Sequence, residues 1–568
     1  MLNFTDISYG CFGNNKYYSI QLIQAWGQYI VFRKWGRVGA ACPARASETF
    51  PSIDSAKAAF QKSFTSKSGN KWPLVGPFEK KKGKYVYVEL ADDEPEDENT
   101  DGAANGAKAG TDSKGAVKSE LPEKVQDVLK LICDSTLIAK EVSSMNIDLK
   151  RMPLGRLSKA QIAQGYGLLQ QLSDALTAIN EIENPPAPTP APTPTPAASR
   201  RRGGAASSAA SVPATTGRTT RRRGAAASNA ASTSTAAATP ALATPAAPTA
   251  RKKKLSAANA TRLRELKNEL KTLSSEFYSL IPHDFGRALP PVLDTMEVVK
   301  TKIDLLQVLA DIELSQQLQQ EEKKKAGSGA PPIHPLDAQY NMINTKMEPL
   351  DATSDEFKLI ERFVERTQAP SQTAYKLKIQ SILKITRPNE EQPRSAFEKV
   401  DNHRLLWHGS RLSNVVGILS QGLRIAPPEA PKNGYMFGKG IYFADSVSKS
   451  AQYCWTSPDR PRAVLLLAEV ALGKSYEAPQ PEYLDFAAVY SRGCASTKGM
   501  GQMAPREETF ERTTDGVVVP IGQIAPQNVQ AGVLFNEFIV YQTEQVKLRY
   551  LITTDFDYAA SRYSGFGY

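Results

Sequence analysis

The chain is poor in cysteine and histidine and has no long apolar run, and each shortage excludes a class of protein. Its five cysteines among 568 residues are odd in number and form no C-x-x-C pair. This argues against a disulfide scaffold, a zinc ribbon or an iron–sulfur protein. The most apolar run, 463–472, is broken by Glu469, and the first twenty residues lack an apolar signal core. We expect a soluble intracellular protein with no metal site and no membrane span.

Acidic residues are absent from one long stretch, residues 185–254. It holds eleven basic residues. The whole chain has 70 basic and 59 acidic residues, so the other 498 residues carry 59 of each sign, and the net charge of +11 lies entirely in this stretch. The stretch also has eleven prolines and no aromatic residue, so it cannot bury enough apolar surface to offset ordering. We predict a disordered insertion, whose loop closure costs a surrounding fold only about 2 kcal/mol.

The rest of the chain divides by periodicity and charge. Residues 1–88 have 13 basic and 4 acidic residues, and alternating apolar positions such as Tyr18, Ile20 and Leu22 predict a β-rich module. Eight acidic residues and no basic one lie between 89 and 101, which indicates a solvated linker over 89–117.

Helical periodicity begins near residue 118. Ser158 and Gln161 form a predicted capping box, and apolar residues then follow on one helical face. A coiled coil is disfavoured because the pattern lasts too few heptads and breaks at Pro282, so we predict a helical bundle over 118–326, interrupted by 185–254. Residues 333–560 alternate short apolar runs with Gly and Pro, which predicts a mixed α+β domain with a β core.

Three short motifs in this last region place polar groups in apolar surroundings. The run 405–410 ends an apolar strand at His408 and a glycine, 434–445 is a glycine-rich loop that enters a strand at Tyr442, and 533–541 places Glu537 inside an apolar strand. Burying an unpaired carboxylate is expensive, so Glu537 needs a function. The letters of 499–504 match a dinucleotide fingerprint, but a proline follows where a helix is required, so we interpret this run as a loop.

These motifs resemble the poly(ADP-ribose) polymerase family. His408, Tyr442 and Glu537 are similar to its His-Tyr-Glu triad in order and local sequence, and residues 35–39 are similar to the Trp-Gly-Arg motif of the WGR domain. Residues 152–158 and 280–286 resemble segments of the helical regulatory domain of the family. The resemblance extends over residues 1–560 apart from the two linkers, and is strongest to short, DNA-dependent members without zinc fingers.

The resemblance implies an ADP-ribosyltransferase fold that binds NAD as its substrate. Tyr442 and Tyr453 would sandwich the cationic nicotinamide, adding cation–π attraction of about 0.5–2 kcal/mol each. Glu537 would bind the nicotinamide ribose and orient the acceptor hydroxyl. The resemblance also implies that the Gly409 backbone and the Ser450 hydroxyl bind the carboxamide, and that His408 binds the adenosine ribose. Ser410 and Arg424 would contact the adenosine moiety.

Each of these residues also has a structural interpretation. A histidine at a strand end is usually a satisfied structural residue, the two tyrosines could be core aromatics, and Glu537 could face solvent on an edge strand. The three motifs together favour function.

In the N-terminal module, Arg33, Trp35 and Arg37 would share one face of a regular strand, a basic and aromatic surface suited to DNA. The alternative is a solvated basic face with Trp35 in the core. Residues 40–43 depart from the family, which usually has another glycine there.

The combined prediction is a nuclear enzyme, stimulated by DNA breaks, that transfers ADP-ribose from NAD to proteins and extends the polymer. Its possible acceptors include the protein itself and histones. The helical domain would restrict NAD access until the WGR module contacts damaged DNA. Two alternatives stay open: a mono-ADP-ribosyltransferase, and a catalytically inactive DNA- or chromatin-binding protein. For residues 185–254 we hypothesise nuclear localisation through the basic residues at 221–223 or 251–254, and auxiliary DNA binding.

Overall fold

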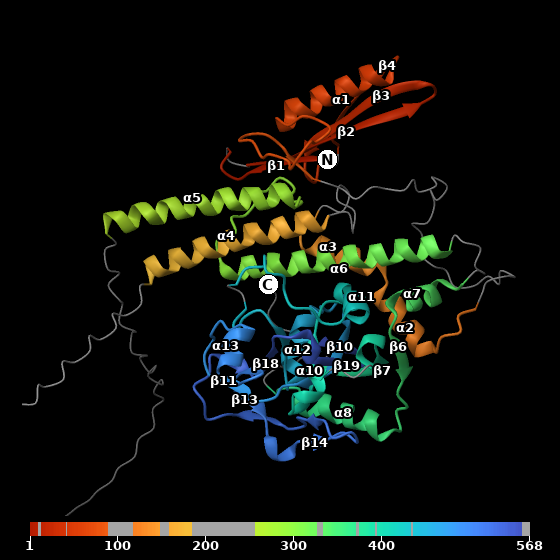
Figure 1. Ribbon diagram of the computed structural model, residues 1–568, viewed down its shortest axis with the longest axis vertical. Helices are drawn as coiled ribbons and strands as arrows, with labels where there is room; N and C mark the ends of the chain where they lie inside the picture. The colour runs from red at the N-terminus through yellow and green to blue at the C-terminus, as the bar shows by residue number, and fades with distance from the viewer. Residues whose placement is uncertain are drawn as a thin grey trace, which may run out of the picture.

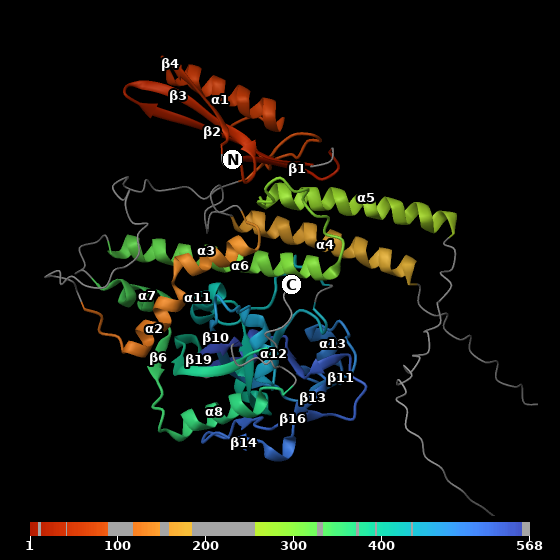
Figure 2. The same cartoon turned by 180° about the vertical axis from the view of Figure 1, so that it is seen from behind.

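Three regions follow one another in the computed structural model of the protein (Figure 1). The structure describes residues 1–9, 13–40, 42–88, 118–147, 158–184, 256–326, 333–370, 374–391, 395–432 and 435–558. The predicted acidic linker, the basic insertion and residues 152–157 lie outside the described residues. A β-sheet with one helix lies at one end, long helices form the middle layer, and a mixed α+β region lies at the other end (Figures 1 and 2).

The N-terminal region is an antiparallel sheet in the order β4-β3-β2-β1-β5. Its elements are β1 (Leu2–Asp6), β2 (Asn14–Ala25), β3 (Gln28–Arg37), β4 (Ala44–Phe50), α1 (Ile53–Ser68) and β5 (Val86–Tyr87). Trp26 and Gly27 connect β2 to β3 with φ of 49° and 72°, a two-residue turn whose twist matches the strands. The predicted strands are confirmed, whereas α1, capped by Ser52 and Gly69, was not predicted.

The middle layer consists of α3 (Ser135–Ser144), α4 (Lys159–Glu183), α5 (Ala257–Leu280) and α6 (Met296–Ala326). The predicted capping box is confirmed, because the Ser158 side chain accepts from the Gln161 backbone and the Gln161 side chain accepts from the Ser158 backbone. The predicted apolar stripe of α4, including Leu169 and Leu172, is buried against α5 and α6. Helix α2 (Glu123–Ile132) instead packs against the core of the C-terminal region.

The C-terminal region is built around three sheets, with strand orders β14-β15-β8-β10-β19-β7-β6, β11-β12-β18-β9 and β16-β13-β17. The strands are β6 (Lys346–Pro349), β7 (Lys376–Thr386), β8 (His403–Gly409), β9 (Ile441–Phe443), β10 (Arg462–Ala471), β11 (Ser475–Ala478), β12 (Ser496–Gly499), β13 (Gly501–Pro505), β14 (Glu511–Arg512), β15 (Val518–Val519), β16 (Ile524–Pro526), β17 (Val533–Phe535), β18 (Glu537–Val540) and β19 (Val546–Asp557). The helices are α7 (Pro335–Ile343), α8 (Asp355–Thr367), α9 (Pro388–Glu391), α10 (Ser395–Lys399), α11 (Leu412–Gln421), α12 (Val447–Ala451) and α13 (Phe486–Ser491).

Two local predictions in this region were wrong. Residues 499–504 form the end of β12 and most of β13 rather than a loop, because both segments pair with neighbouring strands. The run 533–541 is two strands rather than one, since Asn536 lies between β17 and β18 and the two belong to different sheets. The exclusion of a Rossmann fingerprint at 499–504 holds, because a strand follows the glycines where that motif requires a helix.

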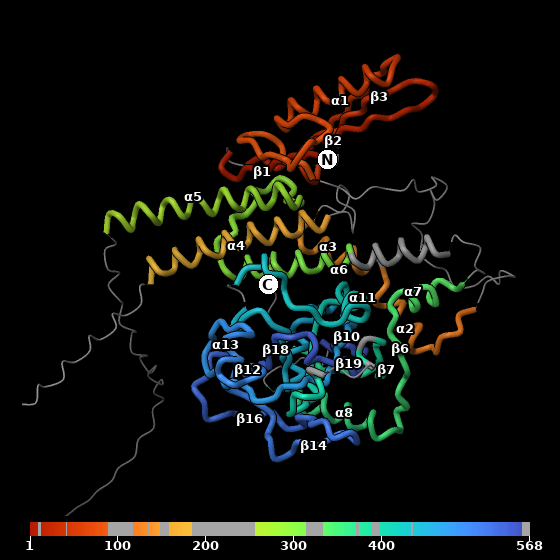
Figure 3. The backbone as a smooth tube through the Cα atoms, viewed as in Figure 1, coloured from red at the N-terminus to blue at the C-terminus, as the bar shows by residue number. Residues whose placement is uncertain are grey.

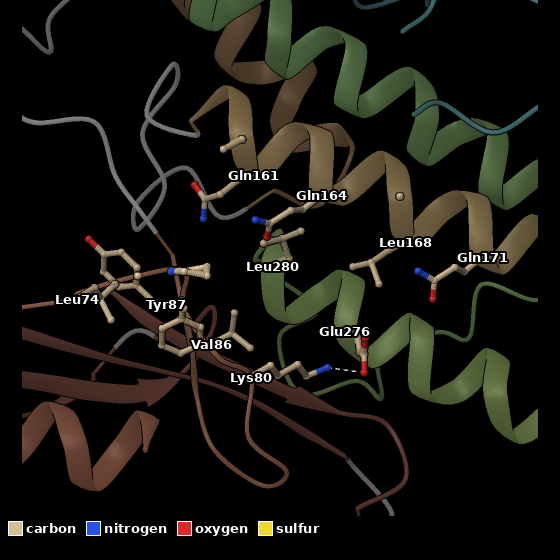
Figure 4. A pocket seen from close by; sticks show the side chains of 15 residues that line it. Leu74, Lys80, Val86, Tyr87, Gln161, Gln164, Leu168, Gln171, Glu276 and Leu280 are labelled. Atoms are coloured by element: carbon tan, nitrogen blue, oxygen red, sulfur yellow. Dashed lines mark ion pairs between the residues drawn. The ribbon is translucent and has the colours of Figure 1, made fainter. Parts of the chain in front are cut away.

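The N-terminal sheet docks on the end of α5 and the segment that follows it. Asn3 Nδ2 donates to the carbonyls of Tyr278 and Ser279, at 3.0 Å each, and Asn15 Nδ2 donates to the His283 carbonyl at 2.9 Å. Beside this contact lies a pocket of about 650 Å³ between the sheet region and helices α4 and α5 (Figure 4). An ion pair of Lys80 with Glu276 joins its two walls (Figure 4).

The helical layer also contacts the C-terminal region, which lies on its opposite side (Figure 3). Arg411, beside α11, pairs with Glu141 of α3 at 3.2 Å, and both side chains are buried. The Lys432 backbone N–H donates to Oε1 of Gln170 of α4 at 3.0 Å. The helical layer therefore lies between the N-terminal sheet and the region with the predicted triad.

Candidate functional site

Neighbouring strands bring the three predicted triad residues together. His408 is near the end of β8, Tyr442 is in the middle of β9, and Glu537 begins β18. Strand β9 pairs with β18, with Tyr442 opposite Ile539, and a bridge between Trp407 and Ala444 joins β8 to the end of β9. Residues separated by more than 120 positions in sequence thus lie at one edge where two sheets meet.

His408 is held in one tautomer by the backbone of Tyr442. Its Nδ1 lies 2.9 Å from the Tyr442 carbonyl oxygen, which can only accept, so Nδ1 carries the proton and Nε2 is left as an acceptor. Burial lowers the pKa of His408, against the opposing effect of this hydrogen bond. The ring is therefore neutral at pH 7, and Nε2 can accept a hydrogen bond from a ligand hydroxyl.

The Tyr442 hydroxyl is committed to the loop that precedes its strand. It donates to the Gly438 carbonyl at 2.7 Å and accepts from the Phe437 backbone N–H at 3.1 Å. Burial raises the pKa of Tyr442, as does the nearby Glu537 carboxylate, so the phenol stays protonated. Its hydroxyl is a structural anchor that fixes the ring plane.

Glu537 is buried and forms an ion pair with Lys449 of α12. The distance from Lys449 Nζ to Glu537 Oε1 is 2.8 Å, and Glu537 is only 5% exposed. The same ammonium lies 5.4 Å from the ring centre of Tyr453, which is 39% exposed. Burial lowers the pKa of Lys449, but Glu537 and Tyr453 outweigh that effect and raise it. The carboxylate thus faces a cation beside an accessible aromatic ring.

Gly409 and Ser450 pack so closely that the position excludes a side chain. A Cβ added at Gly409 would lie 1.8 Å from the Ser450 carbonyl oxygen, far below any van der Waals contact. Ser450 is buried on α12, one residue from Lys449. Next to this pair, Ser410 Oγ accepts a hydrogen bond from Asn414 at 3.1 Å.

Arg424 contacts the helical layer. It forms an ion pair with Asp311 of α6, whose side chain is buried. Burial raises the pKa of Asp311 to about 6, although Arg424 and the Gln307 amide act in the opposite direction. A residue that the resemblance assigns to NAD binding is therefore held by the predicted regulatory bundle.

The three residues predicted to bind DNA lie on β3, but in different surroundings. Trp35 stacks on Tyr18, with ring centres 5.7 Å apart, inside an aromatic cluster. Arg33 donates to Ser63 of α1 and pairs with Glu48. Arg37 Nε donates to the Gly286 carbonyl at 2.6 Å and Nη2 to the Ala288 carbonyl at 2.8 Å. Trp35 is half-buried in this cluster, and Arg33 and Arg37 each have partners within the protein.

Sequence reasoning missed Lys449 and a buried polar pair beneath the site. Asn536 Nδ2 donates to Asp445 Oδ2 at 2.8 Å, and Asn536 Oδ1 accepts from the Gly501 backbone at 2.8 Å. Burial raises the pKa of Asp445 to about 6 against the effect of the Asn536 hydrogen bond. The signal available was the adjacency of these polar residues to motif residues: Asn536 precedes Glu537 and Lys449 precedes Ser450.

Three domain models match the chain in the same order as its structural regions. A WGR domain matches residues 1–79, the regulatory domain of poly(ADP-ribose) polymerase matches 119–206 and 243–340, and the poly(ADP-ribose) polymerase catalytic domain matches 354–556. These matches define a protein that combines a WGR, a helical regulatory and a catalytic domain, and they confirm the predicted multidomain α+β fold class.

Curated relatives extend over nearly the whole chain. Poly [ADP-ribose] polymerase 2 of Homo sapiens is 34% identical over 98% of this chain and 79% of its own length. Poly [ADP-ribose] polymerase 2 of Zea mays is 31% identical over 96% of this chain and 69% of its own length. The chain belongs to the poly(ADP-ribose) polymerase family.

The chain spans less than half of some longer relatives. It is 34% identical to poly [ADP-ribose] polymerase 1 of Gallus gallus over 97% of this chain but 44% of that protein.

Among the described residues, no helix is both long and apolar enough to cross a membrane.

Proposed function

We propose that this protein is an NAD-dependent protein poly-ADP-ribosyltransferase that DNA breaks stimulate. The observation that carries the proposal is the ion pair, 2.8 Å long, between the buried Glu537 and the half-buried Lys449, on the edge that also holds His408 and Tyr442. An ionisable pair inside a β core is costly to maintain unless it serves binding or chemistry. Its chemistry fits a substrate with a cationic ring and ribose hydroxyls.

NAD occupies this edge in the proposal. The nicotinamide ring stacks between Tyr442 and Tyr453, its carboxamide bonds the Gly409 backbone and the Ser450 hydroxyl, and His408 accepts from the adenosine ribose. The absence of a side chain at Gly409 supports this assignment, because it lets β8 pack directly on the Ser450 backbone and so places the two residues assigned to the carboxamide side by side. Ser410 and Arg424 contact the adenosine moiety, the latter after it leaves Asp311.

Glu537 carries the transfer step. The bond between the anomeric carbon of the nicotinamide ribose and the ring nitrogen breaks, its electrons pass to that nitrogen, and nicotinamide leaves neutral without a proton donor. The Glu537 carboxylate stabilises the positive charge on the sugar. The oxygen of the acceptor hydroxyl then bonds the anomeric carbon, and Glu537 accepts the proton that this hydroxyl loses. One carboxylate is enough, in contrast to the pair in glycosidases.

The helical layer restrains this site, and DNA contact by the WGR domain releases it. Two ion pairs that join the layer to the catalytic region support this step, Asp311–Arg424 and Glu141–Arg411. Arg37 connects the N-terminal sheet to the same layer through two carbonyls. The proposed acceptors are proteins, including this chain and histones, and the proposed site of action is the nucleus.

The test measures nicotinamide release and product length together. Purified protein receives labelled NAD with a histone acceptor and a nicked duplex, and the products are separated on a denaturing gel. We expect one nicotinamide released for each ADP-ribose incorporated, and a ladder of polymers on the gel. A single added unit would identify a mono-ADP-ribosyltransferase, and no release would leave a DNA-binding protein without this activity.

A further inference from the structure

Two buried polar side chains, Asn536 and Asp445, lie beneath the strands that carry the triad, and the proposed function uses neither of them. Asn536 immediately precedes Glu537, and Asp445 comes shortly after Tyr442 in the sequence. Buried polar groups are costly unless their hydrogen bonds are made, so the partners of this pair show what it holds in place.

The Asn536 side chain uses both ends of its amide. Its Nδ2 donates to Asp445 Oδ2 at 2.8 Å, and its Oδ1 accepts from the Gly501 backbone N–H at 2.8 Å and from Gln527 Nε2 at 3.2 Å. A backbone N–H can only donate, so the amide oxygen must face Gly501 and the amide nitrogen must face the carboxylate. The chemistry of the partners therefore fixes one orientation of Asn536.

This amide lies where the chain passes from one sheet to another. Strand β17 ends at Phe535 and β18 begins at Glu537, and the two strands belong to different sheets. A Cβ added at Gly501 would lie 2.4 Å from the Phe535 carbonyl carbon and 2.5 Å from the Asn536 nitrogen. The backbone of β13 thus packs directly on the peptide that leads into β18, and the bonds of Asn536 fix the point where Glu537 begins its strand.

Asp445 is joined to the strands of the other two triad residues. It directly follows Ala444, which exchanges two backbone hydrogen bonds with Trp407 of β8, at 2.8 and 3.0 Å. Ala444 itself follows the last residue of β9. The bond from Asn536 to Asp445 therefore connects the start of β18 to the ends of β8 and β9.

The Asp445 carboxylate has cations near it. Burial raises the pKa of Asp445 to about 6, against the opposing effects of the Asn536 hydrogen bond, Lys498 and Arg404. Both cations line a cavity of about 310 Å³ that Asp445 and Asn536 also line. At pH 8 the carboxyl is ionised, and a hydrogen bond to an ionised acceptor is stronger than a neutral one.

We propose that Asn536 and Asp445 are positioning residues for the transfer step, which hold the Glu537 carboxylate in register with His408 and Tyr442. This inference rests on the proposed function, because it concerns the role assigned there to Glu537. Neither residue contacts NAD, and both act through Glu537. A carboxylate that stabilises charge at one carbon loses effect steeply when it moves, and a displacement of about 1 Å can cost about 100-fold in rate.

The test begins with Asn536→Asp, which keeps the size of the side chain and places a second carboxylate opposite Asp445. Two carboxylates at this distance repel each other. The measurement is nicotinamide release as a function of NAD concentration at pH 8, with a histone acceptor and saturating nicked duplex. We expect kcat to fall at least about tenfold, with KM for NAD changed less than about threefold. An unchanged kcat would overturn the proposal.

The reversed pair, Asp445→Asn/Asn536→Asp, restores the hydrogen bonds. The carboxylate at position 536 can accept from the Gly501 N–H, from Gln527 and from the amide at position 445, and the net charge is that of the unchanged protein. We expect kcat to recover to within about threefold of the unchanged protein, because the two sites are directly coupled. A folded reversed variant with a kcat as low as that of Asn536→Asp would contradict the positioning role.

A matched control separates positioning from the loss of any buried hydrogen bond. Gln545 is also a buried amide, and its Nε2 donates to the carbonyls of Ala471 and Ala495 at 2.9 and 3.1 Å. Gln545→Ala should lower the temperature of thermal unfolding and leave kcat unchanged. If Gln545→Ala lowers kcat as much as Asn536→Asp does, the effect is structural and the proposal fails.

A double variant tests whether the pair acts through Glu537. In the Glu537→Gln background, Asn536→Asp should cause no further loss of nicotinamide release, because the carboxylate that it positions is already gone. Losses that add would mean that Asn536 acts elsewhere, and would overturn the proposal.

The unchanged protein separates this inference from the proposed function. If it releases nicotinamide and Asn536→Asp does so with the same kcat, the positioning role alone fails. If the unchanged protein releases no nicotinamide with the nicked duplex, the proposed function fails and the positioning role fails with it.

Discussion

Arg424 of the catalytic region and Asp311 of helix α6 form an ion pair across the boundary between two domains. The carboxylate is buried, and the arginine is one that the family resemblance assigns to NAD. This contact links the helical layer to a residue that the proposed function assigns to NAD.

Asp311→Asn should raise NAD use in the absence of DNA several-fold. The substitution removes the charge that holds Arg424 while keeping the size of the side chain, so Arg424 becomes available to the substrate. The measurement is the initial rate of nicotinamide release without DNA. Glu181→Gln, at an exposed position of α4, is the control and should change nothing. If the DNA-free rate of Asp311→Asn equals that of the unchanged protein, the Asp311–Arg424 ion pair does not restrain the site.

The same contact should weaken at low pH. Burial raises the pKa of Asp311 to about 6, so the carboxyl becomes neutral as pH falls through 6 and the restraint on Arg424 is lost. The DNA-free rate of the unchanged protein should therefore approach that of Asp311→Asn between pH 7.5 and 5.5. Because this pKa lies above the ordinary value of 3.8, the group adds stability at low pH that is lost as pH rises through 6. If the ratio of the DNA-free rates of the unchanged protein and Asp311→Asn does not change with pH, protonation of Asp311 does not release the restraint.

Glu537→Gln should lose polymer elongation more severely than NAD binding. The amide can still bond the ribose, but it can neither stabilise positive charge nor accept the acceptor's proton. We expect short products or none on a gel, with the dissociation constant for NAD changed less than about tenfold. Polymers of undiminished length would refute the assigned role of Glu537.

Gly409→Ala should abolish activity and lower stability, because its Cβ would lie 1.8 Å from the Ser450 carbonyl. Gly167→Ala is a matched control in helix α4, where an added Cβ meets nothing within 4 Å. In a helix interior that change should stabilise by about 1 kcal/mol. Thermal unfolding and NAD turnover of both variants check the pair. An active Gly409→Ala variant would mean that α12 can move away from β8.

Arg37→Ala should bind a nicked duplex yet respond to it poorly. Its guanidinium contacts the Gly286 and Ala288 carbonyls of the helical region, so its loss disconnects the N-terminal sheet from the layer that restrains the site. The ratio of rates with and without saturating nicked DNA is the measurement. Arg33→Ala, which lacks these contacts, should retain most of the stimulation. Equal loss in both variants would place the role of Arg37 in DNA binding instead.

Replacing residues 185–254 with a 12-residue Gly/Ser linker should leave unfolding of the helical bundle nearly unchanged. Helices α4 and α5 pack along their lengths and are joined near the insertion by an ion pair of Lys267 with Glu183 at 3.2 Å. Loop closure changes slowly with length, so shortening it alters stability by about 2 kcal/mol or less. Calorimetry tests this, and nuclear import of the same variant tests the localisation role of the basic residues.

The sequence predicted those features that depend on periodicity and on short motifs. The strands β2 and β3, the capping box at Ser158 and the burial of Glu537 follow from alternation and local chemistry. Helix α1 was missed because its hydrophobic pattern is weak, with Lys and Ser at many positions and only three buried residues. Its stability comes from packing on the sheet, a tertiary effect that propensity does not contain.

The contacts between domains were beyond sequence reasoning. Nothing near Asp311 in the sequence indicates that it pairs with Arg424, 113 residues away. Lys449 likewise shows no role in the sequence, because its ion pair with Glu537 forms only in the fold, where α12 lies beside β18. Trp35 shows the converse, since strand alternation placed it beside Arg33 and Arg37, while the packing of α1 decides that this face lies in an aromatic cluster.

The most direct test of DNA-released restraint is the rate of ADP-ribose incorporation from labelled NAD by the full chain, measured with and without a nicked duplex. If the helical layer restrains the site and DNA releases it, the rate should be low without DNA and rise at least tenfold with the nick, and the long polymers should vanish in Glu537→Gln. An equal, high rate in both conditions would contradict the restraint by the helical layer and its release by DNA.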